Sequence, residues 1–153
     1  MIRIGKMAAV VFSGLAFACA QAAEEGGQAT FSKILFLGNS ITLHGPAPEI
    51  GWTNNWGMAA SAESKDYVHL VTAAVAAQTG TEPAILVRNI ADFERAYTTC
   101  DVETQLADVF AFQPDLFVLA IGENVPELAS EEQVNQFKTA VLRIVNGVLA
   151  QNS

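Results

Sequence analysis

The chain has 153 residues, about the size of one domain, and 51% of them are apolar while 16% are charged. This composition excludes a disordered chain, because so many apolar residues can form a core. The formal net charge is −8 and no basic cluster offsets it, so a nucleic-acid partner is not expected.

The first 22 residues have the pattern of a secretory signal peptide. Arg3 and Lys6 give a positive start, residues 7–18 are apolar, and the sequence AQA at 20–22 is a small-x-small cleavage site. The apolar stretch is shorter than the roughly 20 residues that a spanning helix needs. We therefore expect a periplasmic or secreted protein without a membrane span, and its mature part is more acidic than the whole chain.

Few residues are suited to bind metal or to form disulfides. Leu15 lies one residue too far before Cys19 for a lipoprotein signal, so lipid attachment is not expected. Cleavage after residue 22 leaves Cys100 alone, which excludes an internal disulfide. His44 and His69 are scattered and form no zinc pattern. We expect neither a metal nor a cofactor.

The first half of the chain predicts one strand, a long loop and one helix. Residues 23–32 form a polar, mobile lead-in, and residues 33–37 form a strand that is apolar on both faces, which is typical of a parallel sheet. Residues 45–57, rich in Pro, Gly and Trp, form a long loop, and such loops are commonly functional. Ser61 is expected to cap a helix that ends at Gly80.

The second half predicts two more strands, each followed by a helix. Residues 84–87 form a short apolar strand, and a loop is expected from 88 to 99. Asp101 is expected to cap a helix, residues 116–121 (LFVLAI) form the third strand, and Ser130 opens the last helix. Alternating strands and helices predict an α/β fold with a doubly wound parallel sheet and right-handed crossovers.

The third strand is apolar on both faces and is therefore expected to have a neighbour on each side. In a doubly wound order the first strand lies between the second and the third, so another strand should follow beyond residues 116–121. The sequence ends at Ser153, where that strand would begin. We expect residues 33–153 to be the front part of a larger α/β domain whose C-terminal strands are missing; the alternative is a complete three-stranded fold.

Polar residues follow the first and third strands, where sites form in parallel sheets. Ser40 follows the first strand and Asn124 the third, so the two should lie close together. A serine on a sharp turn, flanked by backbone N–H groups and a carboxamide donor, suits acyl transfer. Gly38 and Gly122 allow the backbone to pass close to a reacting group.

Two segments carry a resemblance to a known family. FLGNSIT at 36–42 resembles the first block of the SGNH/GDSL hydrolases, with Asn39 where their pattern has Asp, and AIGEN at 120–124 resembles the third block. The resemblance implies a three-layer α/β/α sandwich with flavodoxin-like strand order. It also implies a serine esterase acting on carboxylic esters, acyl groups on carbohydrates among them. Ser40 would be the nucleophile, and its N–H and Asn124 would be oxyanion donors.

The chain departs from this family at three places. No glycine occurs between Gly80 and Gly122 to match the second block, so a backbone N–H near Glu94, in NIADFERAY at 89–97, is the expected substitute. Val125 stands where many members have Asp. The Asp-x-x-His that supplies the general base is absent, and such a base is worth typically ~10²–10⁴-fold in rate. We therefore expect little activity from the printed chain and a base supplied by the complete protein.

Other interpretations of these residues remain. His44 could act as the base, although a loop histidine is usually solvated, and His69 suits a structural role. Trp52 and Trp56 either pack the long loop or stack on a sugar. If Ser40 only caps a helix, the protein is a non-catalytic exported carbohydrate-binding module. A phosphate site at a helix after Gly38 is disfavoured because the lysine of a P-loop is absent.

Overall fold

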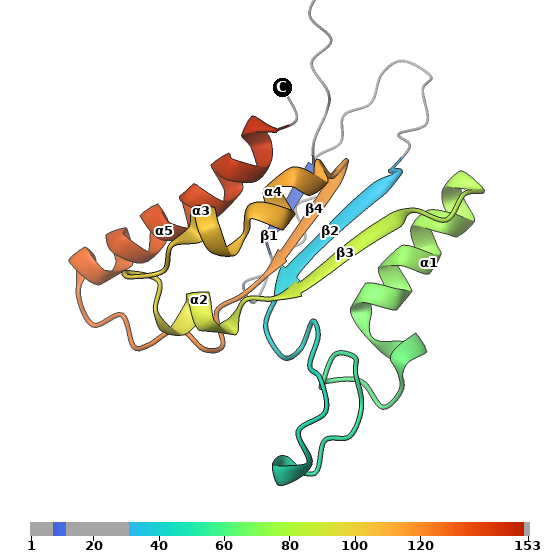
Figure 1. The fold of residues 1–153 in the computed structure, drawn as a ribbon, viewed down its shortest axis with the longest axis horizontal. Helices are drawn as coiled ribbons and strands as arrows, with labels where there is room; N and C mark the ends of the chain where they lie inside the picture. Colours follow the sequence, from blue (N-terminus) through green and yellow to red (C-terminus); the bar gives the residue numbers. More distant parts are fainter. Residues whose placement is uncertain (1–7, 12–30, 152–153) are drawn as a thin grey trace, which may run out of the picture.

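The computed structural model describes residues 8–11 and 31–151, so most of the predicted signal peptide and lead-in lies outside the described residues. Its described strands form one parallel sheet in the order β1-β4-β2-β3. Their bounds are Ala8–Val11 (β1), Lys33–Gly38 (β2), Ala84–Asn89 (β3) and Leu116–Ala120 (β4). Figure 1 shows the strands side by side with their carboxyl ends at the same edge.

The strand order confirms that the first predicted strand lies between the other two. Gly38 is in register with Asn89 of β3 and with Ala120 of β4, so the three strands end at one level. The far side of β4, where a further strand was expected, is paired with β1. That strand falls within the segment predicted to be a signal peptide.

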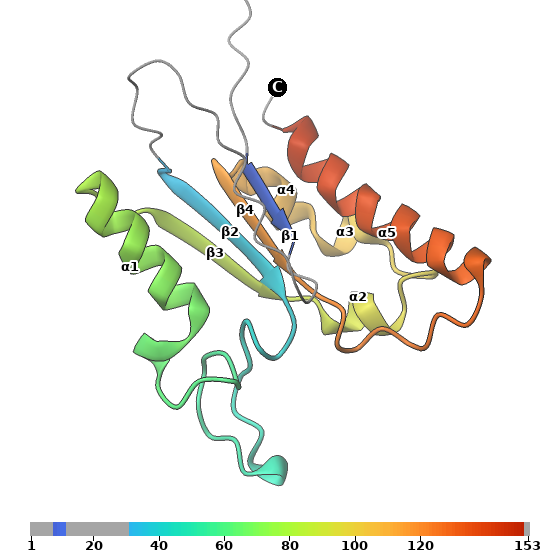
Figure 2. The same cartoon turned by 180° about the vertical axis from the view of Figure 1, so that it is seen from behind.

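Helices cover both faces of the sheet, as Figures 1 and 2 show. Helix α1 (Tyr67–Thr79) lies on one face. The other face carries α2 (Ala91–Arg95), α3 (Val102–Gln105), α4 (Ala107–Phe112) and α5 (Glu131–Ala150). Two short 3₁₀ helices, η1 (Pro48–Ile50) and η2 (Glu63–Lys65), interrupt the segment between β2 and α1. Among the described residues, no helix combines the length and the hydropathy that crossing a bilayer requires.

The core explains why the central strand is apolar on both faces. Ile34 and Phe36 pack with α1, whereas Leu35 and Leu37 pack with the helices on the opposite face. All four side chains are fully buried. Successive side chains of a strand point to opposite faces, so a strand between two helix layers has no position for a polar side chain.

The observed helix ends confirm some of the predicted capping residues and correct others. Asp101 and Ser130 cap α3 and α5 through their side chains, and Gly80 ends α1 in the left-handed conformation, as predicted. The cap of α1 is Asp66 rather than Ser61, since the Asp66 carboxylate accepts the His69 N–H at 2.8 Å. The segment predicted as a loop at 88–99 contains α2, and the helix after Asp101 is divided into α3 and α4.

Candidate functional site

Ser40 lies in a tight turn directly after β2. The Asn39 carbonyl accepts the N–H groups of Thr42 (2.9 Å) and Leu43 (3.1 Å), and the Asn39 side-chain oxygen accepts the Ile41 N–H (3.0 Å). No α-helix begins here, which corrects the alternatives in which Ser40 caps a helix or a helix N-terminus binds phosphate. The Ser40 carbonyl accepts the Met58 N–H at 2.9 Å, and Ser40 lines a cavity.

The backbone requires glycine at both positions beside the site, Gly38 and Gly122. A Cβ on Gly38 would lie 2.7 Å from the Ala120 carbonyl oxygen and would also collide with the Thr42 side chain. The ends of β2 and β4 can therefore meet only if residue 38 has no side chain. Gly122 has space around it, but its φ of 140° is one that other residues rarely adopt.

The turn that carries Ser40 is bonded to the loop that carries Asn124. Asn39 is 1% exposed, and its side-chain Nδ2 donates a hydrogen bond to a carboxylate oxygen of Glu123. Residues 84 positions apart in sequence are thus brought together, since β2 and β4 are neighbours. No sequence signal other than the order of the strands indicated this pair.

Glu94 organises the loop after β4. Its side chain is fully buried, although it is a carboxylate. It accepts hydrogen bonds from the backbone N–H of Gly122, the backbone N–H of Asn124 (3.5 Å) and the Asn124 side-chain Nδ2 (2.8 Å). The Glu94 N–H itself donates to the Ile90 carbonyl (3.3 Å), and the expected oxyanion donor near Glu94 stays a prediction. Glu94 acts on the loop through its side chain.

Arg95 contacts the oxygen of the Asn124 carboxamide. Its Nη2 donates to Oδ1 of Asn124 at 3.1 Å, and its Nη1 pairs with Asp92 at 3.0 Å. Asp92 and Arg95 therefore form a local ion pair, and Arg95 also reaches the candidate site. A polar bond across 29 positions could not be inferred from sequence spacing.

A cavity of about 390 Å³ opens beside Ser40. It is formed by the turn after β2, the long loop, the end of β3 and α2. His44 lines it, and its Nδ1 lies 2.6 Å from the Gly45 carbonyl oxygen. A carbonyl only accepts, so Nδ1 carries the proton of that bond and Nε2 is left for other partners. The lining residues are Ser40, His44, Ile50, Met58, Asn89, Ala91, Asp92 and Arg95.

Trp52, Trp56 and His69 make contacts within the protein. The rings of Trp52 and Trp56 pack edge to face with centroids 5.7 Å apart. Their indole N–H groups donate to the carbonyls of His44 (3.0 Å) and Ala60 (3.1 Å). Neither tryptophan lines the Ser40 cavity, so their position favours loop packing over sugar stacking. The His69 ring lies 2.7 Å from Asp66, the cap of α1.

Tyr67 supports the turn from the opposite side. Its hydroxyl lies 2.7 Å from the Thr42 hydroxyl. Burial raises the pKa of Tyr67, and the bond with Thr42 opposes this only in part. The phenol is therefore a neutral support rather than a base near neutral pH.

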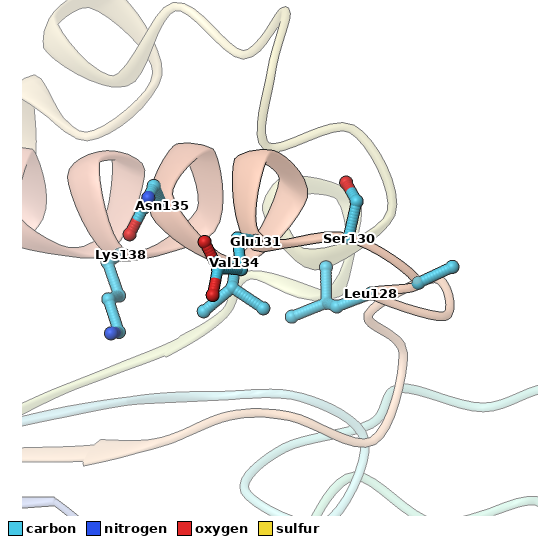
Figure 3. Close-up of a pocket in the computed structure, with 7 residues that line it drawn as sticks. Leu128, Ser130, Glu131, Val134, Asn135 and Lys138 are labelled. Atoms are coloured by element: carbon cyan, nitrogen blue, oxygen red, sulfur yellow. The ribbon is translucent and has the colours of Figure 1, made fainter.

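A second cavity, of about 600 Å³, lies at the start of α5 and is shown in Figure 3. Glu131 and Lys138 are among its lining residues, and it shares none of them with the Ser40 cavity. It combines no hydroxyl with an imidazole, so it is the weaker candidate for catalysis. Within the described part of the chain, no group of His, Cys, Asp and Glu is arranged to hold a metal ion.

Comparisons do not assign the chain to a family: no protein-family model, no curated protein and no solved structure matches it. The fold and site define an α/β protein with a parallel sheet and a polar candidate site at its carboxyl edge.

Proposed function

We propose that the protein is an exported serine hydrolase of the SGNH/GDSL type that cleaves carboxylic esters through an acyl-serine intermediate. One observation carries the proposal. The turn bearing Ser40 is bonded to the loop in which Asn124 is held by Glu94 and Arg95. A nucleophilic hydroxyl and an oriented carboxamide donor are the two groups that acyl transfer requires beside a base.

The chemistry follows from these groups. The Ser40 Oγ attacks the ester carbonyl while a base takes its proton, and the Ser40 N–H and the Asn124 Nδ2 stabilise the negative oxygen that forms. The alcohol leaves with a proton, and water then releases the acid from the serine. The position of β2 between β3 and β4 is compatible with the front part of a three-layer sandwich of flavodoxin-like order.

The cavity supports a polar substrate. His44, Asn89, Asp92 and Arg95 offer donors and acceptors to an alcohol part rich in hydroxyl groups. We therefore propose an acylated carbohydrate as the substrate class. The signal-peptide pattern of residues 1–22 supports a periplasmic or secreted location.

The general base is the part of the mechanism that needs its own test. The resemblance implies an Asp-x-x-His, which the printed sequence does not contain, and His44 is the histidine that shares a cavity with Ser40. If His44 is the base, His44→Ala should lower kcat by ~10²–10⁴-fold. A loss below about tenfold would exclude His44 as the base.

The decisive experiment uses the product of the complete gene. A serine-reactive phosphonate should label Ser40, and Ser40→Ala should abolish both labelling and the hydrolysis of acetylated sugars. Ser61→Ala, on an exposed serine outside the cavity, is the matched control and should leave both unchanged. Hydrolysis by Ser40→Ala at the parent rate would refute the proposed function.

A further inference from the structure

We propose that Glu94 and Arg95, consecutive residues of α2, are positioning residues that fix which way the Asn124 carboxamide points. The inference rests on the proposed function, in which Asn124 is an oxyanion donor. An ionised carboxylate only accepts hydrogen bonds and a guanidinium only donates them. Glu94 lies at the nitrogen of the carboxamide (2.8 Å), and Arg95 lies at its oxygen (3.1 Å).

This arrangement allows only one orientation of the amide. If the Asn124 amide were flipped, its oxygen would face the Glu94 carboxylate and its NH₂ would face the Arg95 guanidinium. Both contacts would then join like partners, and both bonds would be lost. In the observed orientation one N–H of Nδ2 donates to Glu94. The second N–H remains for a developing oxyanion.

The burial of Glu94 supports a role beyond packing. A buried carboxylate is costly unless it is hydrogen-bonded, and an apolar side chain would fill the same space without that cost. Glu94 is 0% exposed, and all three of its donors belong to the loop after β4. The carboxylate thus shapes the backbone at Gly122 and orients the side chain at Asn124. Arg95 links this loop to the cavity, because it also lines the space beside Ser40.

Glu94→Gln tests the inference with little change in volume. The glutamine oxygen can still accept the Gly122 N–H, but its NH₂ then faces the NH₂ of Asn124. The Asn124 amide should turn, which removes the donor from the oxyanion. Loss of one such donor costs about 10²–10³ in kcat, so we expect a fall of about 100- to 1,000-fold with KM changed less than about twofold.

Two further variants separate orientation from stability. Glu94→Gln combined with Asn124→Asp restores a donor–acceptor pair between the loops but supplies no oxyanion donor. It should regain the Tm that Glu94→Gln loses, while kcat stays low. Glu103→Gln is the matched control, because Glu103 is an exposed carboxylate paired with Arg143 away from the cavity, and its kcat should equal the parent value.

A readout without catalysis distinguishes failure of this inference from failure of the proposed function. In ¹⁵N–¹H NMR spectra of the parent protein, the side-chain NH₂ of Asn124 should exchange slowly with solvent. Glu94→Gln should shift its resonances and speed the exchange. Unchanged resonances, or a lowered Tm with kcat unchanged, would overturn the positioning role. Parent-level hydrolysis by Ser40→Ala would overturn the esterase while the spectra still decide the orientation of Asn124.

Discussion

Asn39→Asp probes the bond between the Ser40 turn and the loop after β4. The substitution keeps the side-chain oxygen that accepts the Ile41 N–H, so the turn itself can persist. The other side of the group changes from an NH₂ that donates to Glu123 into a second carboxylate oxygen. The SGNH/GDSL pattern that residues 36–42 resemble has Asp at this position, whereas here the opposing Glu123 favours the amide.

The expected cost can be worked out from the geometry. Two unit charges about 4 Å apart repel each other by about 1 kcal/mol in water and about 4 kcal/mol at an effective dielectric constant of 20. Asn39 is buried but Glu123 is exposed, which places the pair between these limits. The hydrogen bond to a charged group, worth about 1.5–3 kcal/mol, is lost as well. We expect Asn39→Asp to lower the free energy of unfolding by at least about 2.5 kcal/mol near pH 7, since both costs apply together.

The destabilisation by Asn39→Asp should depend on pH. Glu123 raises the folded-state pKa of the introduced carboxyl above its unfolded value of about 3.9. The folded variant therefore binds the proton more tightly than the unfolded chain. The penalty should be complete near neutral pH and should shrink as the pH falls below the raised folded pKa toward the unfolded value.

Urea unfolding of the variant and parent, at about pH 4 and about pH 7, measures this difference. Glu123→Gln in the Asn39→Asp background should restore most of the stability at neutral pH, because the glutamine NH₂ can donate to the new carboxylate. Equal stability of Asn39→Asp and the parent near pH 7 would refute the reasoning. So would a double variant no more stable than the single one.

Two further substitutions test residues that support the Ser40 turn. Gly38→Ala should lower the free energy of unfolding by about 1–3 kcal/mol, because the new Cβ would press on the Ala120 carbonyl. Urea titration measures this loss, and an unchanged unfolding midpoint would contradict the close approach of β2 and β4. Tyr67→Phe tests the alkaline limit. Burial raises the folded-state pKa of Tyr67, so this residue's contribution to stability is complete below about pH 10 and is lost as the pH rises through the folded pKa. Tyr67→Phe should lose less stability than the parent above that pH, and an identical loss would exclude Tyr67 as the cause.

The parts of the fold that sequence reasoning predicted are those with local or periodic signals. The apolar runs at β2 and β4 indicated strands buried on both faces, and Asp101, Ser130 and Gly80 act at helix ends because capping is local chemistry. Helix α2 was missed because its stability comes from tertiary burial of Phe93 and Glu94 rather than from propensity. Asp66 replaced Ser61 as a cap because η2 occupies the intervening turn.

For the candidate site, the sequence predicted the location but not the side-chain contacts. The strand order alone brought the loops of Ser40 and Asn124 to one edge of the sheet. The partners of Glu94 lie 28 and 30 positions away, on another strand's loop, so only the three-dimensional structure shows that its carboxylate contacts Gly122 and Asn124. The segment after Ser40 is a turn and not the helix of the capping alternative, because the Asn39 side chain and carbonyl satisfy the backbone donors there.

The long loop between β2 and α1 is folded on itself. Antiparallel bridges join His44 to Trp56 and Ala47 to Trp52, and the two indole rings pack edge to face. Its tip, at Pro48–Ile50, is therefore held by the loop's own bonds rather than by the sheet, and Ile50 reaches the cavity. Substitutions at this tip would change the lining of the cavity without disturbing the strands that precede Ser40 and Asn124. If the proposed function holds, the choice of substrate could therefore vary independently of these two residues.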